Sequence, residues 1–472
     1  MRKLKKILLG VLIILLLCGV GVYIFLRQPI APMDGTHRLT NVSAPVTIQR
    51  DAYGIPHIFA KTKIDAMRAL GYITASERLF QMEMSRRLTQ GELSEVVGDK
   101  ALKTDMLYRS LMLKKSSQRM LNLKQAKGLI DSKMWAEMEA FTDGINQYMA
   151  ERPLPYELVI LGIKPRPFTP LDSYIMTGQM AYSFGIALKA DTTMTEIAKK
   201  LTPDLFQQLR NDRLSTPITL ASNSPDLSPL WNLPEFMPSF DSSNSWLISP
   251  RRSASGKAIF ANDPHISFGN PAVWFEAHIK TPEFELYGHY LPLVPFAVLG
   301  HNRHHAWGFT MSQTDDMDLY RETIDRDKKT VLFKGKSQPY DTWTETIKVR
   351  GHRDVSIEVI ETPHGPLMNS VLDQKDLALK WAFHRVENDP LLALYKMGEA
   401  KDIKEFEIAL KDGSAPGLNV MYADPQNIAW WMFGDIAVKK NPNSDLILNG
   451  ATGADEYERL LSWDEKPHEV NP

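Results

Sequence analysis

The stretch Asp241-Ser242-Ser243-Asn244-Ser245-Trp246 lies where the chain changes character. Before it, residues 216–241 are rich in proline and serine, which interrupt regular secondary structure and predict a linker. After it, a short strand is predicted at residues 245–248. A serine in front of a strand is by itself usually a turn or capping residue, so its meaning depends on the rest of the chain.

The two halves on either side of this stretch have different periodicities. Apolar residues at three- and four-residue spacing predict helices from residue 63 to about 148, after short strands at 46–50 and 56–60. A helical pair near 391–397 and 403–410 interrupts the second half. The other predicted strands are 258–262, 283–290, 306–310, 356–360, 377–381, 419–422 and 428–433. A helical half followed by a strand-rich half predicts an α+β fold.

Composition excludes several classes of protein. The chain has 472 residues, of which 43% are hydrophobic and 24% charged, as in ordinary globular proteins. Its 55 Lys and Arg balance 56 Asp and Glu, so no basic field attracts nucleic acid. The single cysteine, Cys18, excludes both a disulfide framework and a thiolate metal cluster within one chain.

The N-terminus predicts a membrane segment. Basic residues at positions 2, 3, 5 and 6 precede an uncharged run at 7–26, which is about the length needed to cross a bilayer as a helix. Positive charge before the span keeps the N-terminus in the cytoplasm, so the rest of the chain is expected on the periplasmic or extracellular side, anchored by this helix. A cleaved signal peptide and a secreted protein are the alternative.

Several ordered motifs extend over most of the exported chain. The second half carries Ser243-Asn244-Ser245-Trp246, Asn262-Asp263-Pro264-His265, Gly300-His301-Asn302, Ala306-Trp307-Gly308 and Asp315-Asp316-Met317-Asp318. The first half carries three further motifs, at residues 50–58, 78–87 and 91–95. Together they resemble the penicillin acylase family of N-terminal-nucleophile hydrolases, which includes cephalosporin acylases and acyl-homoserine lactone acylases.

The resemblance implies a four-layer αββα fold that is C-terminally incomplete. It divides the chain into an anchor or signal (1–27), a helical α-subunit-like region (28–215), a linker propeptide (216–242) and a truncated β-subunit-like region (243–472). It also implies a precursor that cleaves itself between Ser242 and Ser243 into two associated chains. The freed α-amino group of Ser243, with a pKa of about 7.7–8.0, then serves as the base for the adjacent hydroxyl.

The resemblance assigns roles to further residues. The backbone N–H of Met311 is implied as an oxyanion donor, and His265 is implied to orient the Ser243 amine, although a lone histidine is more often structural. Asn244 is interpreted mainly as a partner of the nucleophile turn. The substrate is expected to be a small acylated amide of the penicillin, cephalosporin or acyl-homoserine lactone type. Its acyl group is expected in an apolar pocket that includes Trp274, Phe275 and Met311.

The acidic run at 315–318 is a second candidate site. Carboxylates with an intervening carbonyl suit Ca²⁺, which takes about 6–8 oxygen ligands. By resemblance, the ligands of a structural calcium ion are Asp315, the Met317 carbonyl, Asp318 and, from the first half, Glu196. A solvated acidic turn is the alternative interpretation.

Two departures from the family leave a second function open. Ser242 stands where the family usually has glycine before the nucleophile, and the family's asparagine that supplies a second oxyanion donor is not present before Pro472. The alternative is therefore a catalytically inactive, membrane-tethered remnant of the same fold. A metalloenzyme is not indicated, because no His-x-x-x-His pair lies on a helical pattern.

Overall fold

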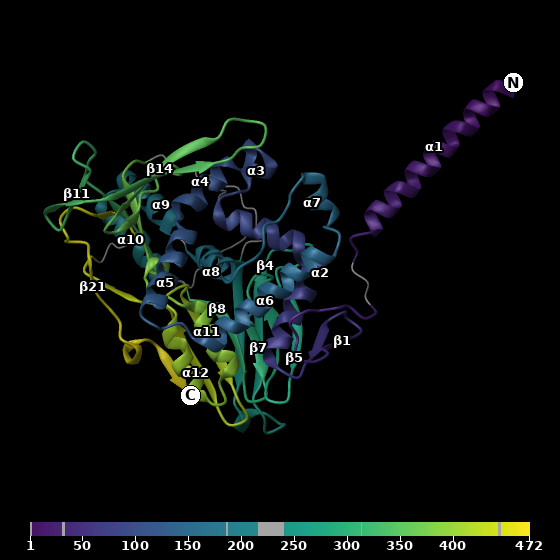
Figure 1. Ribbon diagram of the computed structural model, residues 1–472. Helices are drawn as coiled ribbons and strands as arrows, with labels where there is room; N and C mark the ends of the chain where they lie inside the picture. Colours follow the sequence, from purple (N-terminus) through teal and green to yellow (C-terminus); the bar gives the residue numbers. More distant parts are fainter. Residues whose placement is uncertain are drawn as a thin grey trace.

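The computed structural model describes residues 2–30, 34–185, 187–215, 240–312, 314–372, 374–441 and 445–472. Helix α1 (Arg2–Arg27) projects away from the rest of the chain and buries none of its residues, as Figure 1 shows. Within the described residues it is the one helix long and apolar enough to cross a membrane. A signal sequence passes the same test, so both predicted interpretations of this segment remain.

Helices dominate the chain up to residue 215. They are α2 (Lys63–Gln90), α3 (Ser94–Val97), α4 (Leu102–Ser110), α5 (Leu113–Ala126), α6 (Ser132–Glu151), α7 (Tyr156–Leu161), α8 (Pro170–Phe184), α9 (Ala187–Lys200) and α10 (Pro203–Ser215). Thr62 caps α2 by accepting the Asp65 N–H at 3.1 Å, and Gly91 ends it in the left-handed conformation with φ 63°. The helices predicted between residues 63 and 148 are confirmed.

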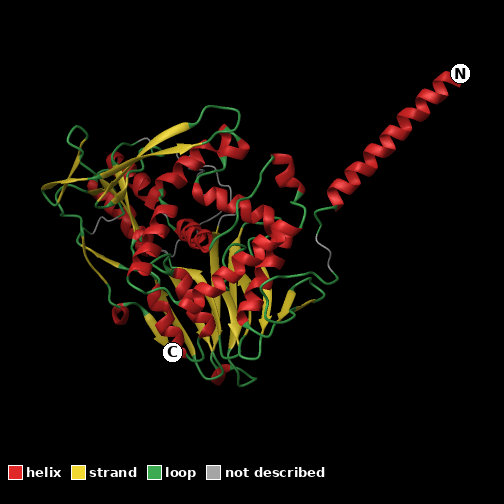
Figure 2. Ribbon diagram, viewed as in Figure 1, coloured by secondary structure: helices red, strands yellow, loops and turns green. Residues whose placement is uncertain are grey.

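A nine-stranded sheet lies beneath these helices (Figure 2), in the order β1-β2-β5-β6-β7-β8-β17-β18-β22. Its strands are β1 (Thr47–Arg50), β2 (Pro56–Phe59), β5 (Phe275–Lys280), β6 (Glu285–Tyr290), β7 (Leu299–Asn302), β8 (Ala306–Met311), β17 (Leu418–Ala423), β18 (Ile428–Phe433) and β22 (His468–Val470). Among the described pairings of this sheet, the β2–β5 pairing is parallel and the others are antiparallel. The β2–β5 pairing joins the part of the chain before residue 243 to the part after it.

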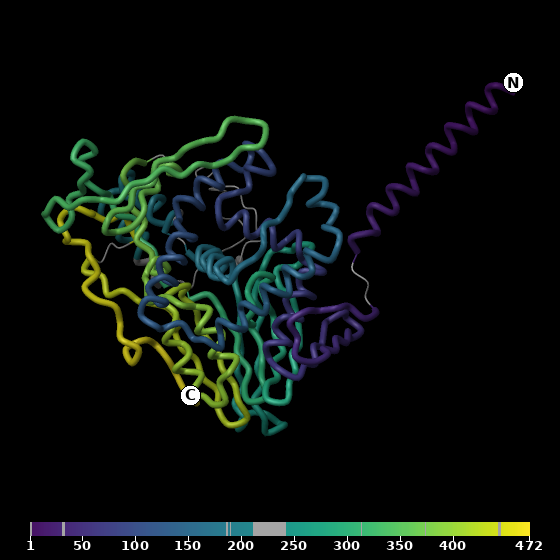
Figure 3. The backbone as a smooth tube through the Cα atoms, in the orientation of Figure 1, coloured from purple at the N-terminus to yellow at the C-terminus, as the bar shows by residue number. Residues whose placement is uncertain are grey.

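The remaining strands form smaller sheets. They are β3 (Phe240–Ile248) with β4 (Ile259–Ile266); β10 (Ile324–Asp325), β11 (Thr330–Phe333) and β12 (Lys336–Pro339); β13 (Asp341–Ile347), β14 (Val355–Thr362) and β15 (Gly365–Pro366); β16 (Leu377–Trp381), β9 (Met317–Arg321) and β20 (Leu448–Asn449); and β19 (Ala437–Lys439) with β21 (Tyr457–Leu460). Helices α11 (Pro390–Glu399) and α12 (Ile403–Ala409) form the predicted pair. The tube in Figure 3 shows the C-terminal segment, in yellow, running down the left edge of the molecule to the C-terminus.

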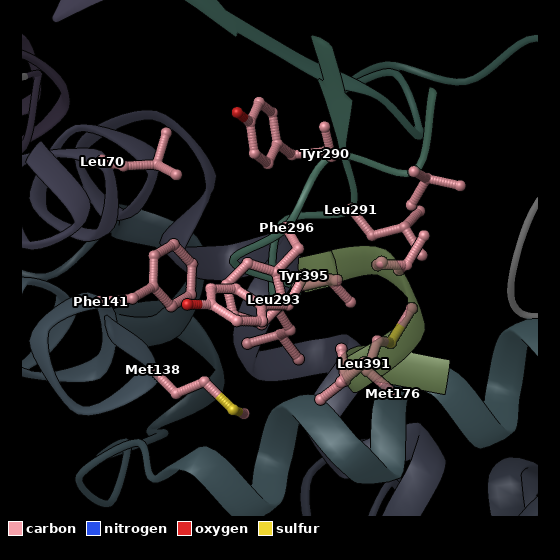
Figure 4. Close-up of a cluster of buried hydrophobic side chains, with 14 of the residues drawn as sticks. Leu70, Met138, Phe141, Met176, Tyr290, Leu291, Leu293, Phe296, Leu391 and Tyr395 are labelled. Atoms are coloured by element: carbon pink, nitrogen blue, oxygen red, sulfur yellow. The ribbon is translucent and has the colours of Figure 1, made fainter. Parts of the chain in front are cut away.

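One hydrophobic core joins both halves of the chain. Figure 4 shows Leu70 of α2 and Phe141 of α6 in the same cluster as Phe296, Leu391 and Tyr395 from beyond the linker. Full burial of such a side chain contributes about 1.5–3 kcal/mol. Two chains produced by a cut before Ser243 would therefore remain packed together without a covalent link.

The predicted α+β class is confirmed. The boundary between the predicted linker and the following strand differs from the prediction. Of the predicted linker 216–242, residues 216–239 lie outside the described part of the chain. Strand β3 already begins at Phe240, so the Ser242–Ser243 peptide bond lies inside an extended strand and not at the start of one.

A buried histidine ties three segments together away from the nucleophile. His364 Nδ1 lies 2.8 Å from Glu322 Oε1, and its Nε2 lies 2.5 Å from Glu456 Oε1. Its ring stacks on Tyr320 at 4.0 Å between centroids. Burial favours the neutral imidazole, but the hydrogen bonds to Glu322 and Glu456 outweigh it and raise the pKa of His364. Burial also opposes ionisation of Glu456, yet the His364 hydrogen bond and the charge of Lys380 lower its pKa to about 2.

This cluster is expected to make stability depend on pH. The contribution of His364 is complete below about pH 6.5 and is lost as pH rises through its raised folded pKa, whereas that of Glu456 is complete above about pH 4.3 and is lost toward pH 2. We expect the wild-type unfolding temperature to fall between pH 6 and pH 9, and His364→Gln to show a smaller fall. Thermal unfolding followed by circular dichroism measures the difference. Parallel pH curves for the two proteins would contradict the assignment.

Candidate active site

Ser243 lies on the inner side of the β3–β4 hairpin, which packs against β8. Side chains alternate along a strand, so Ser243 is half-buried while its neighbours Ser242 and Asn244 are exposed. The backbone N–H of Met311, at the end of β8, donates to Ser243 Oγ at 3.1 Å. The structure thus brings the predicted nucleophile to the predicted oxyanion donor across 68 residues of sequence.

His265 lies on the outer side of the same hairpin. Its Nε2 is 2.8 Å from Asp263 Oδ2 and 3.4 Å from Asn244 Nδ2, and its Nδ1 is 2.5 Å from Ser242 Oγ. With Nε2–H donating to the carboxylate, Nδ1 accepts the Ser242 hydroxyl proton. His265 therefore contacts both Asn244 and the residue before the nucleophile. Its predicted role toward the Ser243 amine stays a prediction.

Asn262 fixes the hairpin on β8, a role that sequence reasoning missed. Its Nδ2 donates to the Phe309 carbonyl at 3.0 Å and to the Asn244 carbonyl at 3.2 Å, and its Oδ1 accepts the Phe309 N–H at 3.2 Å. Gly308 makes this approach possible, because a β-carbon there would lie 2.4 Å from Asn262 Oδ1. Both residues belong to the quoted motifs, but the motifs do not reveal their contact.

Asn419 of β17 holds the Met311 backbone from the other side. Its Nδ2 donates to the Met311 carbonyl at 3.0 Å and to Thr310 Oγ1 at 3.1 Å, while its Oδ1 accepts from Trp430 Nε1 at 3.0 Å. The Met311 peptide is therefore held by a side chain whose own hydrogen bonds are satisfied. A donor fixed in advance in this way loses little energy on reorganisation when negative charge develops.

A small apolar cavity of about 30 Å³ adjoins Ser243. It is lined by Met180, Phe184, Ser242, Ser243, Pro264, Trp274, Val298, Leu299, Phe309, Thr310, Met311 and Leu418. Trp274 and Met311 line it as expected, whereas Phe275 is buried in the main core. The cavity is about the size of one or two water molecules, so an acyl group can enter only if it widens.

A larger cavity of about 790 Å³ lies elsewhere, between α4, α5 and β13. Arg109, Arg119 and Trp343 are among its lining residues, and none of the predicted site residues lines it. It shares no lining residue with the cavity beside Ser243, so it is not a substrate pocket for the Ser243 hydroxyl.

The acidic run surrounds a lysine. Lys439 Nζ lies 2.5 Å from Asp315 Oδ2 and 2.7 Å from Asp318 Oδ1. Tyr457 donates its hydroxyl proton to the second oxygen of Asp318. Burial raises the pKa of Asp318 to about 6 against the opposing charge of Lys439. Met317 is buried in the adjoining strand β9.

The first half contributes Asp191 here, not Glu196. Asp191 is buried, and its Oδ2 accepts the Leu319 N–H at 3.1 Å. Burial, and then the charges of Asp318 and Asp315, raise its pKa. Five residues turn a helix by about 500°, so Glu196 lies about 140° around α9 from Asp191. Its exposed carboxylate instead accepts from Lys199 at 2.7 Å and Gln374 at 3.2 Å.

These residues do not fit a calcium ion as they lie. An ammonium group cannot coordinate a metal and repels it, and the four predicted ligands are not brought together. Within the described residues, no group of three or more His, Cys, Asp or Glu side chains is arranged to hold a metal. Calcium stays a prediction.

Comparison with known proteins identifies the family of the chain. The sequence profile of the penicillin amidase family matches residues 45–472. The chain belongs to the penicillin amidase family.

Its relatives share about a quarter of its residues. It is 29% identical to the acyl-homoserine lactone acylase QuiP of Pseudomonas aeruginosa, over 90% of this chain and 54% of that protein. It is 28% identical to the penicillin acylase 2 proenzyme of Pseudomonas sp. strain SE83, over 95% of this chain and 60% of that protein. The chain thus spans little more than half the length of these relatives. A penicillin G acylase structure from Alcaligenes faecalis aligns with a TM-score of 0.43 and 25% identity, over 49% of this chain and 42% of that one.

Proposed function

We propose that this chain is the precursor of an amidohydrolase, which cleaves itself before Ser243 and then removes the acyl group from a small acylated amide. The observation that carries this proposal is the 3.1 Å hydrogen bond from the Met311 N–H to Ser243 Oγ. Such a donor is within reach of the oxygen on any carbonyl carbon that Ser243 attacks. The substrate class is that of its relatives, which are named as acyl-homoserine lactone and penicillin acylases.

In the proposed self-cleavage, the Ser243 hydroxyl is the nucleophile. Its oxygen attacks the Ser242 carbonyl carbon, the C–N bond to Ser243 breaks, and the hydroxyl proton passes to the departing nitrogen. Water then hydrolyses the resulting ester, which leaves a carboxylate on Ser242 and a free amine on Ser243. The shared core keeps the two products together as α and β chains.

Substrate hydrolysis then uses both groups of the new N-terminus. The amine, with an ordinary pKa of about 7.7–8.0, accepts the hydroxyl proton as Ser243 attacks the substrate carbonyl. The Met311 N–H stabilises the oxyanion, a contribution of about 2.7–4 kcal/mol in comparable sites. The C–N bond of the substrate then breaks, and its amine leaves with the proton that the Ser243 amine had accepted. The acyl group, now held as an ester on Ser243, occupies the apolar cavity once it has widened, and water hydrolyses the ester to the free acid.

The cellular setting is part of the proposal. Helix α1 directs the chain for export, and the remainder acts outside the cytoplasm, held at the membrane or released if α1 is removed. The inactive remnant is a second candidate, favoured by the engagement of Ser242 Oγ with His265 and by the small cavity beside Ser243.

Self-cleavage distinguishes the two candidates. We expect the purified full chain to yield two fragments, one beginning Ser-Asn-Ser-Trp, and Ser243→Ala to remain uncut. Ser245→Ala is the matched control: it also lies on the inner side of β3, but its hydroxyl donates to the Ala261 carbonyl at 3.1 Å, so cleavage should persist. Intact mass and N-terminal sequencing provide the measurement. An uncut wild-type chain would support the remnant.

A further inference from the structure

The acidic cluster joins a helix that precedes Ser243 to strands that follow it. Asp191 comes from α9, Asp315 lies just before β9 and Asp318 within it, Lys439 ends β19, and Tyr457 begins β21. The Lys439 side chain is 10% exposed and that of Asp318 is 0% exposed. Charges this deeply buried persist only when they are paired and hydrogen-bonded.

We propose that the ammonium group of Lys439 is the resident cation of this cluster and takes the place of a bound metal. Its Nζ lies 2.5 Å from Asp315 and 2.7 Å from Asp318, where a cation shared by the two carboxylates would sit. Calcium needs about 6–8 oxygens at 2.3–2.6 Å, and a buried ammonium both fills that space and opposes a second positive charge.

The surrounding polar groups are already satisfied by the protein. The second oxygen of Asp318 accepts from the Tyr457 hydroxyl, and Asp191 accepts the Leu319 N–H. Asp191 therefore bonds directly to the backbone of β9. The junction between the two halves is built from hydrogen bonds and one ammonium group.

The cluster therefore connects the two sides of the predicted cleavage site without a metal ion. The residues of the cluster come from both sides of Ser243 in the sequence, so their contacts persist whether or not the chain is cut. The inference goes beyond the proposed function and does not depend on it, because stability alone can test it.

The test compares unfolding of the full chain in detergent with EDTA and with excess calcium chloride. We expect the wild type to unfold at the same temperature in both. Lys439→Met keeps most of the length of the side chain but removes its charge, and we expect the unfolding temperature in EDTA to fall by roughly 5–10 °C. Calcium should recover part of that loss, because the bare carboxylates then accept an external cation. Lys440→Met, at the exposed neighbour, is the matched control and should change little.

Three results would overturn the proposal. The first is a wild-type chain that EDTA destabilises and calcium restores, since a metal would then be the resident cation. The second is a Lys439→Met protein no less stable than Lys440→Met. The third is a destabilised Lys439→Met that calcium does not help, which would make the contact an ordinary ion pair. If Lys439→Met does not fold, the wild-type comparison and isothermal titration of the wild type with calcium still decide the matter: no binding supports the proposal and binding overturns it.

Discussion

Replacing Gly71 by alanine is expected to destabilise the chain by about 3 kcal/mol or more, although alanine is the better helix former. Gly71 of α2 lies against α6, and a β-carbon there would be 1.9 Å from the Phe141 carbonyl oxygen. The contact is reciprocal, because a β-carbon at Gly144 of α6 would be 1.9 Å from the Arg68 carbonyl oxygen. Both obstacles are backbone atoms, so only separation of the two helices relieves the clash.

Urea unfolding followed by circular dichroism at 222 nm measures this loss. The control is Lys133→Ala, a change on an exposed position of α6 that leaves the crossing untouched. Without the contact, glycine to alanine within a helix should stabilise by about 0.5–1 kcal/mol. A Gly71→Ala protein as stable as the wild type would therefore show that the helices do not cross this closely.

Local sequence patterns predicted the helices and strands better than they predicted which strands pair with each other. The periodicity of α2 and the alternation of β17 and β18 depend on neighbouring residues, and these elements form where expected. Strand β13 was missed, because its sequence Asp-Thr-Trp-Thr-Glu-Thr-Ile carries few apolar side chains and only one of its seven residues is buried. The order of the nine-stranded sheet depends on pairings between distant segments, which periodicity does not encode.

In the candidate site too, some residues could be predicted from the sequence and others could not. Ser243 and Met311 followed from the family motifs, and the structure brings them together. Lys439 and Asp191 carried no signal, because a lysine far along the chain and an aspartate on an ordinary helix become meaningful only when folding brings them to the same point. Asp191 and Glu196 lie on different faces of α9, and a sequence motif does not define which face meets the acidic run.

The Asn262 side chain is expected to matter to self-cleavage nearly as much as the nucleophile. Asn262→Leu keeps the approximate volume but removes the hydrogen bonds that join the hairpin to Phe309 and to the Asn244 carbonyl. Each buried polar group left unpaired costs about 1–3 kcal/mol, so the hairpin shifts on β8. A displacement of about 1 Å between Ser243 and the Met311 N–H can lower the rate about 100-fold. The rate of appearance of the Ser-Asn-Ser-Trp fragment measures this effect.

Asn302→Leu is the control that distinguishes misalignment of Ser243 from a loss of overall stability. Asn302 is also a partly buried asparagine bonded to backbone: its Oδ1 accepts the His304 and His305 N–H groups at 2.8 and 2.9 Å, and its Nδ2 donates to the Ala400 carbonyl at 2.9 Å. It anchors the turn between β7 and β8, at the opposite end of β8 from Met311. We therefore expect Asn302→Leu to lower the unfolding temperature but to cleave at nearly the wild-type rate. Cleavage slowed equally in the two variants would mean that Asn262 acts through overall stability and not through the alignment of Ser243, and wild-type rates in both would mean that Asn262 does not matter to cleavage.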